Sequence, residues 1–129
     1  MKILRLVLGD QLNQKHSWFQ KADDNIIYIM AEMRQETDYV KHHIQKIVAF
    51  FLGMRSFAED LTSKGHNFIY LNITDKNNPQ DLEQLIKKYL QETSAKKFEY
   101  QLPDEYRLNE QLKHICNNLE VASHVVDTE

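Results

Sequence analysis

The sequence predicts an α/β fold, in which an open, five-stranded parallel sheet carries helices on both faces. Five short apolar runs recur along the chain, and amphipathic helical patterns lie between most of them. The chain has 129 residues, of which 42% are hydrophobic, and this size suits one domain with its own buried core. We therefore expect residues 1–129 to form a single domain.

The five apolar runs are the predicted strands. They cover residues 3–8, 26–31, 68–73, 98–102 and 121–126, and the fourth run is the weakest. Runs that are apolar at nearly every position are typical of strands buried on both faces, as in a parallel sheet. Their alternation with helices predicts right-handed crossovers and a doubly wound, Rossmann-like sheet.

Three helices are predicted between the strands. The longest covers residues 39–64, where apolar side chains recur in steps of three and four, and Gly65 follows as a C-terminal cap. The second opens at Asn78, which is the expected N-terminal cap, with Pro79 at the first helical position. The third covers residues 104–119.

Three smaller features favour structural interpretations. Segment 13–24 reads as a short helix or a packed loop, with Trp18 and Phe19 in the core or in a lid. Cys116 lies on the inward stripe of the third helix, which indicates an inert, buried thiol. The adjacent His42–His43 pair predicts no metal site, because neighbouring side chains on a helix point about 100° apart.

Composition excludes several classes of function. The net charge is −3, so the chain lacks the basic footprint that direct binding to nucleic acid needs. The single cysteine excludes an internal disulfide, and one thiol by itself holds neither zinc nor an iron–sulfur cluster. No segment has the length and apolarity of a signal-peptide core or a membrane span, so a cytoplasmic location without membrane contact is expected.

A ligand site is expected beyond the carboxyl ends of the strands, where open α/β sheets bind their ligands. The residues placed there are Gly9, Asp10, Gln11 and Leu12 after the first strand, Glu32 and Met33 after the second, and Pro103 and Asp104 after the fourth. Their carboxylates and amides suit ligands with hydroxyl groups or heteroaromatic N–H donors. The alternative is that these side chains only cap helices and end strands.

The first turn argues against ordinary dinucleotide and phosphate sites. Gly9 is its single glycine, whereas a dinucleotide fingerprint needs several and a P-loop ends in Gly-Lys-Ser/Thr. Binding of NAD and P-loop phosphoryl transfer are therefore not expected.

A polar stripe on the longest predicted helix extends the candidate site. Glu36, Tyr39, His43 and Lys46 follow one another in steps of three, four and three, which places them on one helix face near the strand ends. An acid, a phenol, an imidazole and an ammonium group would converge there. The alternative is a solvated face with helix-spaced ion pairs, which is a common arrangement for charged stripes.

Five motifs in a fixed order carry a family resemblance. They are RLVLGDQL at 5–12, AEM at 31–33, E-T-x-Y-V-x-H-H-x-x-K-I at 36–47, M-R-x-F-A at 54–58 and P-D-E-Y-R-L at 103–108. Together they resemble the N-terminal region of deoxyribodipyrimidine photolyase-related proteins, which form the bacterial iron–sulfur photolyase and cryptochrome branch. The resemblance runs along essentially the whole chain.

The resemblance implies a role in a larger flavoprotein. In this family the N-terminal α/β domain carries a 6,7-dimethyl-8-ribityllumazine antenna at its interface with the rest of the protein. The C-terminal catalytic domain holds FAD, an iron–sulfur cluster and the DNA-lesion site. By this resemblance, the Gly9–Leu12 turn, Glu32–Met33 and the face from Glu36 to Lys46 line the antenna pocket.

The resemblance also fixes what the chain is not expected to do alone. Light-driven repair of pyrimidine–pyrimidone photoproducts, or blue-light sensing in some relatives, would belong to the full-length protein. The chain stops directly after the fifth strand, which predicts a fragment that lacks the catalytic domain and does not catalyse repair. DNA would be a partner only through that domain.

Two other classes of function remain open from the residues. One is a stand-alone small α/β signalling or nucleotide-binding module. A phospho-receiver, however, needs clustered acids after the first strand and an aspartate after the third, where this chain has Asn72–Ile73–Thr74. The other is an interaction domain with a free sheet edge.

Overall fold

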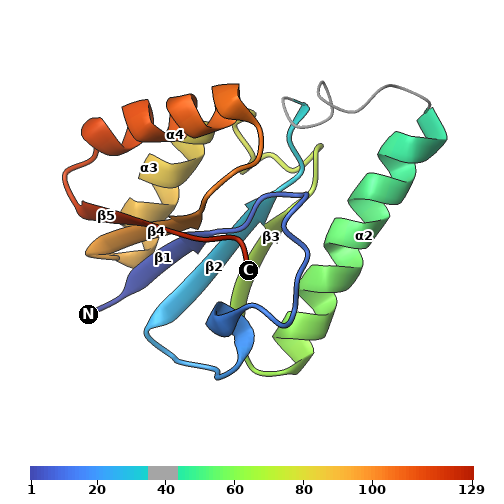
Figure 1. Ribbon diagram of the computed structural model, residues 1–129, viewed down its shortest axis with the longest axis horizontal. Coiled ribbons are helices and arrows are strands. Elements are labelled where there is room, and N and C mark those ends of the chain that lie inside the picture. The colour runs from blue at the N-terminus through green and yellow to red at the C-terminus, as the bar shows by residue number, and fades with distance from the viewer. Residues whose placement is uncertain (35–43) are drawn as a thin grey trace.

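Five parallel strands form one open sheet in the computed structural model, which describes residues 1–34 and 44–129 (Figure 1). The strands are β1 (Ile3–Leu6), β2 (Ile26–Ala31), β3 (Asn67–Leu71), β4 (Lys97–Gln101) and β5 (Ala122–Val126). Their order across the sheet is β3-β2-β1-β4-β5, and every neighbouring pair is parallel. The predicted α/β fold with its parallel sheet is confirmed, although β1 and β3 end two residues earlier than expected.

Helices cover both faces of this sheet, as predicted. The described helices are the 3-10 turn η1 (Ser17–Phe19), α2 (Ile44–Ser63), α3 (Leu82–Thr93) and α4 (Tyr106–Asn117). Helix α2 packs on one face, whereas α3 and α4 pack on the other (Figure 1). Residues 39–43 of the longest predicted helix lie outside the described residues. None of the described helices combines the length and apolarity needed to cross a bilayer.

The strand order contains one reversal of direction. From β1 the chain moves outward to β2 and β3, and it then returns to the other side of β1 to form β4 and β5. The carboxyl ends of β1 and β4 are neighbours at this switch point, with Leu6 in register with Tyr100. In open α/β sheets this is where a crevice for ligands forms.

Strand residues alternate between two apolar cores. Leu4 and Leu6 of β1 face the core under α3 and α4, where both are almost completely buried. On the opposite face, Tyr28 of β2 joins Trp18 and Phe19 in the core under α2. Trp18 and Phe19 are each 6% exposed, so of the two roles predicted for them the structure selects core packing.

One part of the α2 face is charged rather than apolar. The Arg5 Nε atom lies 2.8 Å from Glu99 Oε1, and Lys97 Nζ lies 3.3 Å from the second carboxylate oxygen. The Arg5 guanidinium also lies over the Trp18 ring, 4.7 Å from its centroid. Burial favours the neutral acid, but Arg5 and Lys97 hold the pKa of the Glu99 carboxyl below its usual range.

The predicted start of the second helix is wrong. Helix α3 begins at Leu82, and its N-terminal cap is Asp81, whose side chain accepts a hydrogen bond from Gln84 N at 2.9 Å. Asn78, the predicted cap, is 7% exposed, and its side-chain amide donates to the carbonyl oxygens of Glu32 and Asn72. These long-range bonds keep Asn78 away from the helix end.

Of the other predicted helix ends, the C-terminal end of α2 is confirmed and the bounds of the third helix are corrected. Gly65 ends α2 as predicted, with a φ of 96° and a hydrogen bond from its N–H to Thr62 O at 3.1 Å. The third predicted helix is shorter than expected and covers Tyr106–Asn117. It begins there because the Glu105 side chain caps it, accepting from Leu108 N at 2.7 Å.

Candidate functional site

The turn after β1 packs directly against α2. A side chain at Gly9 would place its Cβ 2.5 Å from Phe50 Cζ and 2.9 Å from Met54 Sδ, so the close approach of turn and helix requires glycine here. Leu12, 38% exposed, lies beside Gly53 on the same helix: its Cδ1 is 3.5 Å from the position of a Gly53 Cβ. Gly9 and Leu12 thus bring the turn to the N-terminal half of α2.

Gln11 ties the two strand ends at the switch point together. Its Oε1 accepts from Leu8 N at 3.1 Å, and its Nε2 donates to Gln101 O at 3.1 Å. The side chain is 4% exposed, so both bonds are shielded from water. Gln11 therefore sets the spacing between the carboxyl ends of β1 and β4.

Two carboxylates follow the strands that meet at this switch point, Asp10 after β1 and Asp104 after β4. Both residues are exposed, whereas Pro103 is buried. Partial burial, together with the negative charge of Asp104, raises the pKa of the Asp10 carboxyl. The structure thus brings together the predicted site residues that follow β1 and β4.

The Glu32 carboxylate has protein partners on both oxygens. It is fully buried and binds Arg55 through two bonds, at 2.7 Å from Nε and 3.0 Å from Nη2. It also accepts from the Tyr70 hydroxyl and, at 3.0 Å, from Ile73 N. Burial opposes ionisation, yet these bonds lower the pKa of Glu32 below 4.5, its ordinary value. Its neighbour Met33 is 3% exposed and belongs to the core under α3 and α4.

Arg55 and Tyr70 are the partners that sequence reasoning missed. Arg55 lies within the M-R-x-F-A motif, but nothing in the spacing of that motif pairs it with a residue 23 positions earlier. The Tyr70 pKa is raised by burial and by the adjacent Glu32 carboxylate. Only the three-dimensional structure joins β2, α2 and β3 in this network.

The polar stripe is described only in part. Glu36, Tyr39 and His43 lie outside the described residues, so their placement stays a prediction. Lys46 is exposed on α2, and it shares one helix face with Phe50 and Gly53 because these positions follow in steps of four and three. This is the face that contacts the turn after β1.

Residues 127–129, which follow β5, bond to the loop after β1 and to the end of β4. His16 is fully buried; its Nδ1 accepts from Trp18 N at 3.1 Å, and its Nε2 lies 2.9 Å from Asp127 O. The hydrogen-bond pattern assigns the proton to Nε2, which then donates to Asp127 O. Thr128 Oγ1 donates to Leu102 O at 2.6 Å. Residues 127–129 thus run across the end of β4 toward the loop after β1.

A buried amide near the switch point has unused hydrogen-bonding capacity. Gln101, the last residue of β4, is 1% exposed, and neither its Nε2 nor its Oε1 has a partner among the described residues. Such groups are uncommon in folded proteins. No pattern in the sequence marked this side chain, because β4 was predicted only as an apolar run.

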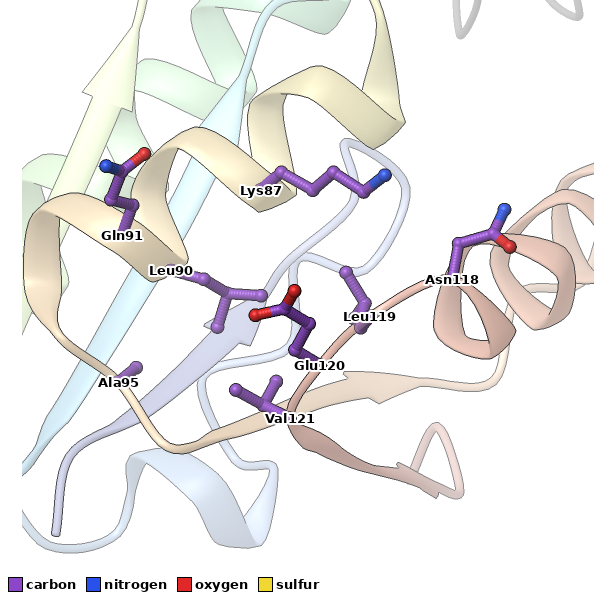
Figure 2. Close-up of a pocket in the computed structure, with 8 residues that line it drawn as sticks. All are labelled: Lys87, Leu90, Gln91, Ala95, Asn118, Leu119, Glu120 and Val121. Atoms are coloured by element: carbon purple, nitrogen blue, oxygen red, sulfur yellow. The ribbon is translucent and has the colours of Figure 1, made fainter.

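A separate groove lies at the other end of the strands, away from the switch point. It has a volume of about 510 Å³ and is lined by Lys87, Leu90, Gln91, Ala95, Asn118, Leu119, Glu120 and Val121. Figure 2 shows Leu90 reaching toward it from α3, and Leu119 and Val121 approaching from the segment before β5. Since Ala95 precedes β4, this groove lies at the amino ends of the strands and contains none of the predicted site residues.

Comparison with known proteins decides the family. Residues 5–129 match the family described as deoxyribodipyrimidine photo-lyase-related protein. The chain belongs to this photolyase-related family. It is also 30% identical over 115 residues to a protein named (6-4) photolyase from Agrobacterium fabrum (strain C58 / ATCC 33970). The match covers 87% of the chain but 22% of that photolyase, so the chain spans about a fifth of the length of this relative.

Proposed function

We propose that the chain is the N-terminal antenna-chromophore-binding domain of a photolyase- or cryptochrome-like flavoprotein. Membership of the photolyase-related family over residues 5–129 is the observation that carries this proposal. The proposed ligand is 6,7-dimethyl-8-ribityllumazine, bound on the exposed side of the contact between the turn after β1 and the N-terminal half of α2. Light absorbed there would serve repair of DNA photoproducts or blue-light sensing in the complete protein.

The described residues of this region fit the chemistry of such a ligand. Leu12, Phe50 and Gly53 form a partly exposed apolar wall suited to a flat heteroaromatic ring. Lys46 is exposed on the same face of α2, and Asp10 supplies an acceptor for ribityl hydroxyls. The ligand would add absorption of blue light, and the protein residues would bind and orient it.

The remaining predicted residues take supporting or additional roles in this proposal. Glu36, Tyr39 and His43 would extend the polar side of the pocket from the stripe that includes Lys46. Glu32 would act indirectly, since Arg55, Tyr70 and Ile73 already occupy its carboxylate. We assign it the task of holding α2 against the sheet.

FAD, the iron–sulfur cluster and DNA are assigned to a C-terminal catalytic domain of the same protein. A cubane cluster needs four cysteine thiolates, and the chain has one cysteine, Cys116. Its net charge of −3 also offers no broad attraction for the DNA backbone. The proposal therefore gives the chain light collection and gives the catalytic domain the electron transfer.

A fluorescence titration of the full-length protein with 6,7-dimethyl-8-ribityllumazine tests the proposal. Leu12→Glu places a charge in the apolar wall, and we expect it to weaken binding at least about tenfold. Lys87→Ala, an exposed lysine on α3, is the control and should leave the Kd unchanged. Equal affinities of the wild type and Leu12→Glu would contradict the proposed position of the ligand.

The isolated chain gives a second test. Because the pocket would lie at an interface, residues 1–129 alone should bind lumazine weakly or not at all. Submicromolar binding by the isolated chain would show that the pocket is complete within it, against this expectation.

A further inference from the structure

The face of the sheet that carries α2 is covered over only part of its width. Helix α2 packs over β2 and β3 (Figure 1), and the Trp18 ring lies against the Arg5 guanidinium of β1. Within residues 1–34 and 44–129, no helix covers β4 or β5 on this side. Strand β5 is accordingly exposed from Ala122 to Val125. Parallel sheets occur almost only with both faces covered, so this part of the face calls for a second layer.

Alternation of side chains along the strands decides which residues lie on this uncovered part. Phe98 of β4 belongs to the core under α3 and α4, so its neighbours Lys97 and Glu99 point to the α2 side. Glu99 is in register with Arg5 of β1 and with His124 of β5, which share its side of the sheet. We call these four residues, Arg5, Lys97, Glu99 and His124, the charged face.

Three basic side chains surround one carboxylate on the charged face. Glu99 Oε1 lies 2.8 Å from Arg5 Nε. Its Oε2 lies 3.3 Å from Lys97 Nζ and 3.4 Å from His124 Nδ1. Arg5 and Lys97 are permanent cations, so together they leave one positive charge unbalanced by Glu99. The Glu99 side chain is 7% exposed, whereas that of His124 is 57% exposed, so the positive side of the cluster faces outward.

A hollow beside Arg5 carries the opposite charge. It has a volume of about 610 Å³, and the other charged residues that line it are Lys21, Asp23 and Asp24. Two acids and one lysine give this lining a net negative charge. An acidic group on a partner is therefore attracted to the β4–β5 side of the face and repelled from the hollow.

We propose that a helix from the part of the protein outside residues 1–129 packs over β4 and β5 and places a carboxylate against Lys97 and His124. Helices are the elements that cover parallel sheets, and a carboxylate matches the unbalanced positive charge. The chain corresponds to 22% of the photolyase from Agrobacterium fabrum, so a protein of that length has ample sequence for this layer. The inference rests on the proposed function only in treating the chain as one domain of a larger protein.

Two other occupants fit the charged face less well. Proteins bind the DNA backbone through several cations at once, whereas the charged face has one permanent cation beyond those that Glu99 balances. A second copy of the chain, related by a two-fold axis, would bring two identical positive surfaces together. Like charges would then meet without a carboxylate between them.

Hydroxyl-radical footprinting of the full-length protein, read by mass spectrometry without DNA, tests whether the face is covered. His124 on the charged face is compared with His114, an exposed histidine of α4 on the opposite side of the sheet. The oxidation rate of each histidine is divided by its rate in urea. We expect this ratio to be at least about fivefold lower for His124 than for His114, because a packed interface excludes water. Equal ratios would overturn the inference.

The same measurement separates the three occupants. Protection of His124 by a helix of the same protein is present without DNA and is independent of protein concentration. Protection that appears only when DNA is added would assign the face to DNA. Protection that increases with protein concentration would assign it to a second copy, and either result would overturn the inference.

Two variants of the full-length protein test the charge of the partner. His124→Lys keeps a basic side chain, whereas His124→Glu would repel a carboxylate. We expect His124→Glu to raise the oxidation rate of Lys97 at least about threefold and His124→Lys to leave it unchanged. Phe98, which is fully buried, reports folding and should stay protected in both variants. Equal oxidation of Lys97 in the two variants, with Phe98 protected, would overturn the assignment of a carboxylate.

These outcomes are distinct from those that test the proposed function. A full-length protein that lacks lumazine but protects His124 would contradict the proposed function alone. A protein that contains lumazine but leaves His124 as reactive as His114 would contradict this inference alone.

Discussion

Replacing Glu32 by glutamine should destabilise the protein by about 2–3 kcal/mol. The carboxylate accepts two bonds from Arg55, one from Tyr70 and one from Ile73 N, and the glutamine NH₂ group would face a donor in place of one oxygen. Each net hydrogen bond to a charged group contributes roughly 1.5–3 kcal/mol, so losing two would cost about 3–6 kcal/mol. The Arg55 side chain is 44% exposed, and its access to water reduces this loss.

Urea denaturation and calorimetry measure this change. For a domain of this size, the expected loss corresponds to a fall in Tm of about 8 °C. Glu59→Gln, an exposed acid on the same helix as Arg55, is the control and should change the unfolding free energy by less than about 0.5 kcal/mol. A Glu32→Gln variant as stable as this control would refute the view that the Glu32 network joins α2 to the sheet.

Three further predictions follow from packing and ionisation. Gly9→Ala should lower the unfolding free energy by about 1–3 kcal/mol because its Cβ would meet α2, whereas Gly53→Ala, with ordinary contact at 3.5 Å, should be neutral or stabilising; equal effects would contradict the packing of this turn. The pKa values of Glu32 and Glu99 lie below 4.5, so their stabilisation is present above that pH and is lost as the pH falls through the lower folded values. The Tm of the wild type should therefore fall on acidification below about pH 4.5, and fall less in Glu32→Gln; parallel curves would argue against this source. Cys116 is only partly buried, rather than fully buried as its place on the inward stripe predicts, and this partial burial raises the pKa of its thiol. Its alkylation at neutral pH should therefore be slower in the folded protein than in urea, and equal rates would contradict this partial shielding.

The fold is predictable from the sequence because its strands are buried on both faces. Runs such as 26–31 are apolar at nearly every position, and that signal depends on no partner elsewhere in the chain. The role of Gly65 at the C-terminal end of α2 was equally predictable, since a glycine after an amphipathic stretch is a local signal. The start of α3 could not be predicted in this way. Asn78 has the sequence context of a helix cap, but its side chain donates a hydrogen bond to Glu32 O, 46 residues earlier.

For the candidate site, the sequence predicted only at which strand ends its residues would lie. The switch-point rule placed Gly9, Gln11 and Asp104 at neighbouring strand ends, and the structure brings the turns that carry them together. The sequence did not predict which contacts the individual side chains would make. Gln11 ties β1 to β4, and Glu32 binds Arg55, through contacts between residues 90 and 23 positions apart in the chain. Residue spacing carries no information about such pairs.

The chromophore content of the full-length protein tests the central claim most directly. The protein should be purified from its native host, its absorption spectrum recorded, and its released chromophores identified by mass. We predict that the wild type contains 6,7-dimethyl-8-ribityllumazine together with flavin, and that Leu12→Glu retains the flavin but loses the lumazine. A wild type that contains flavin without lumazine, or a Leu12→Glu variant that keeps both, would contradict the assignment of this chain as the antenna domain.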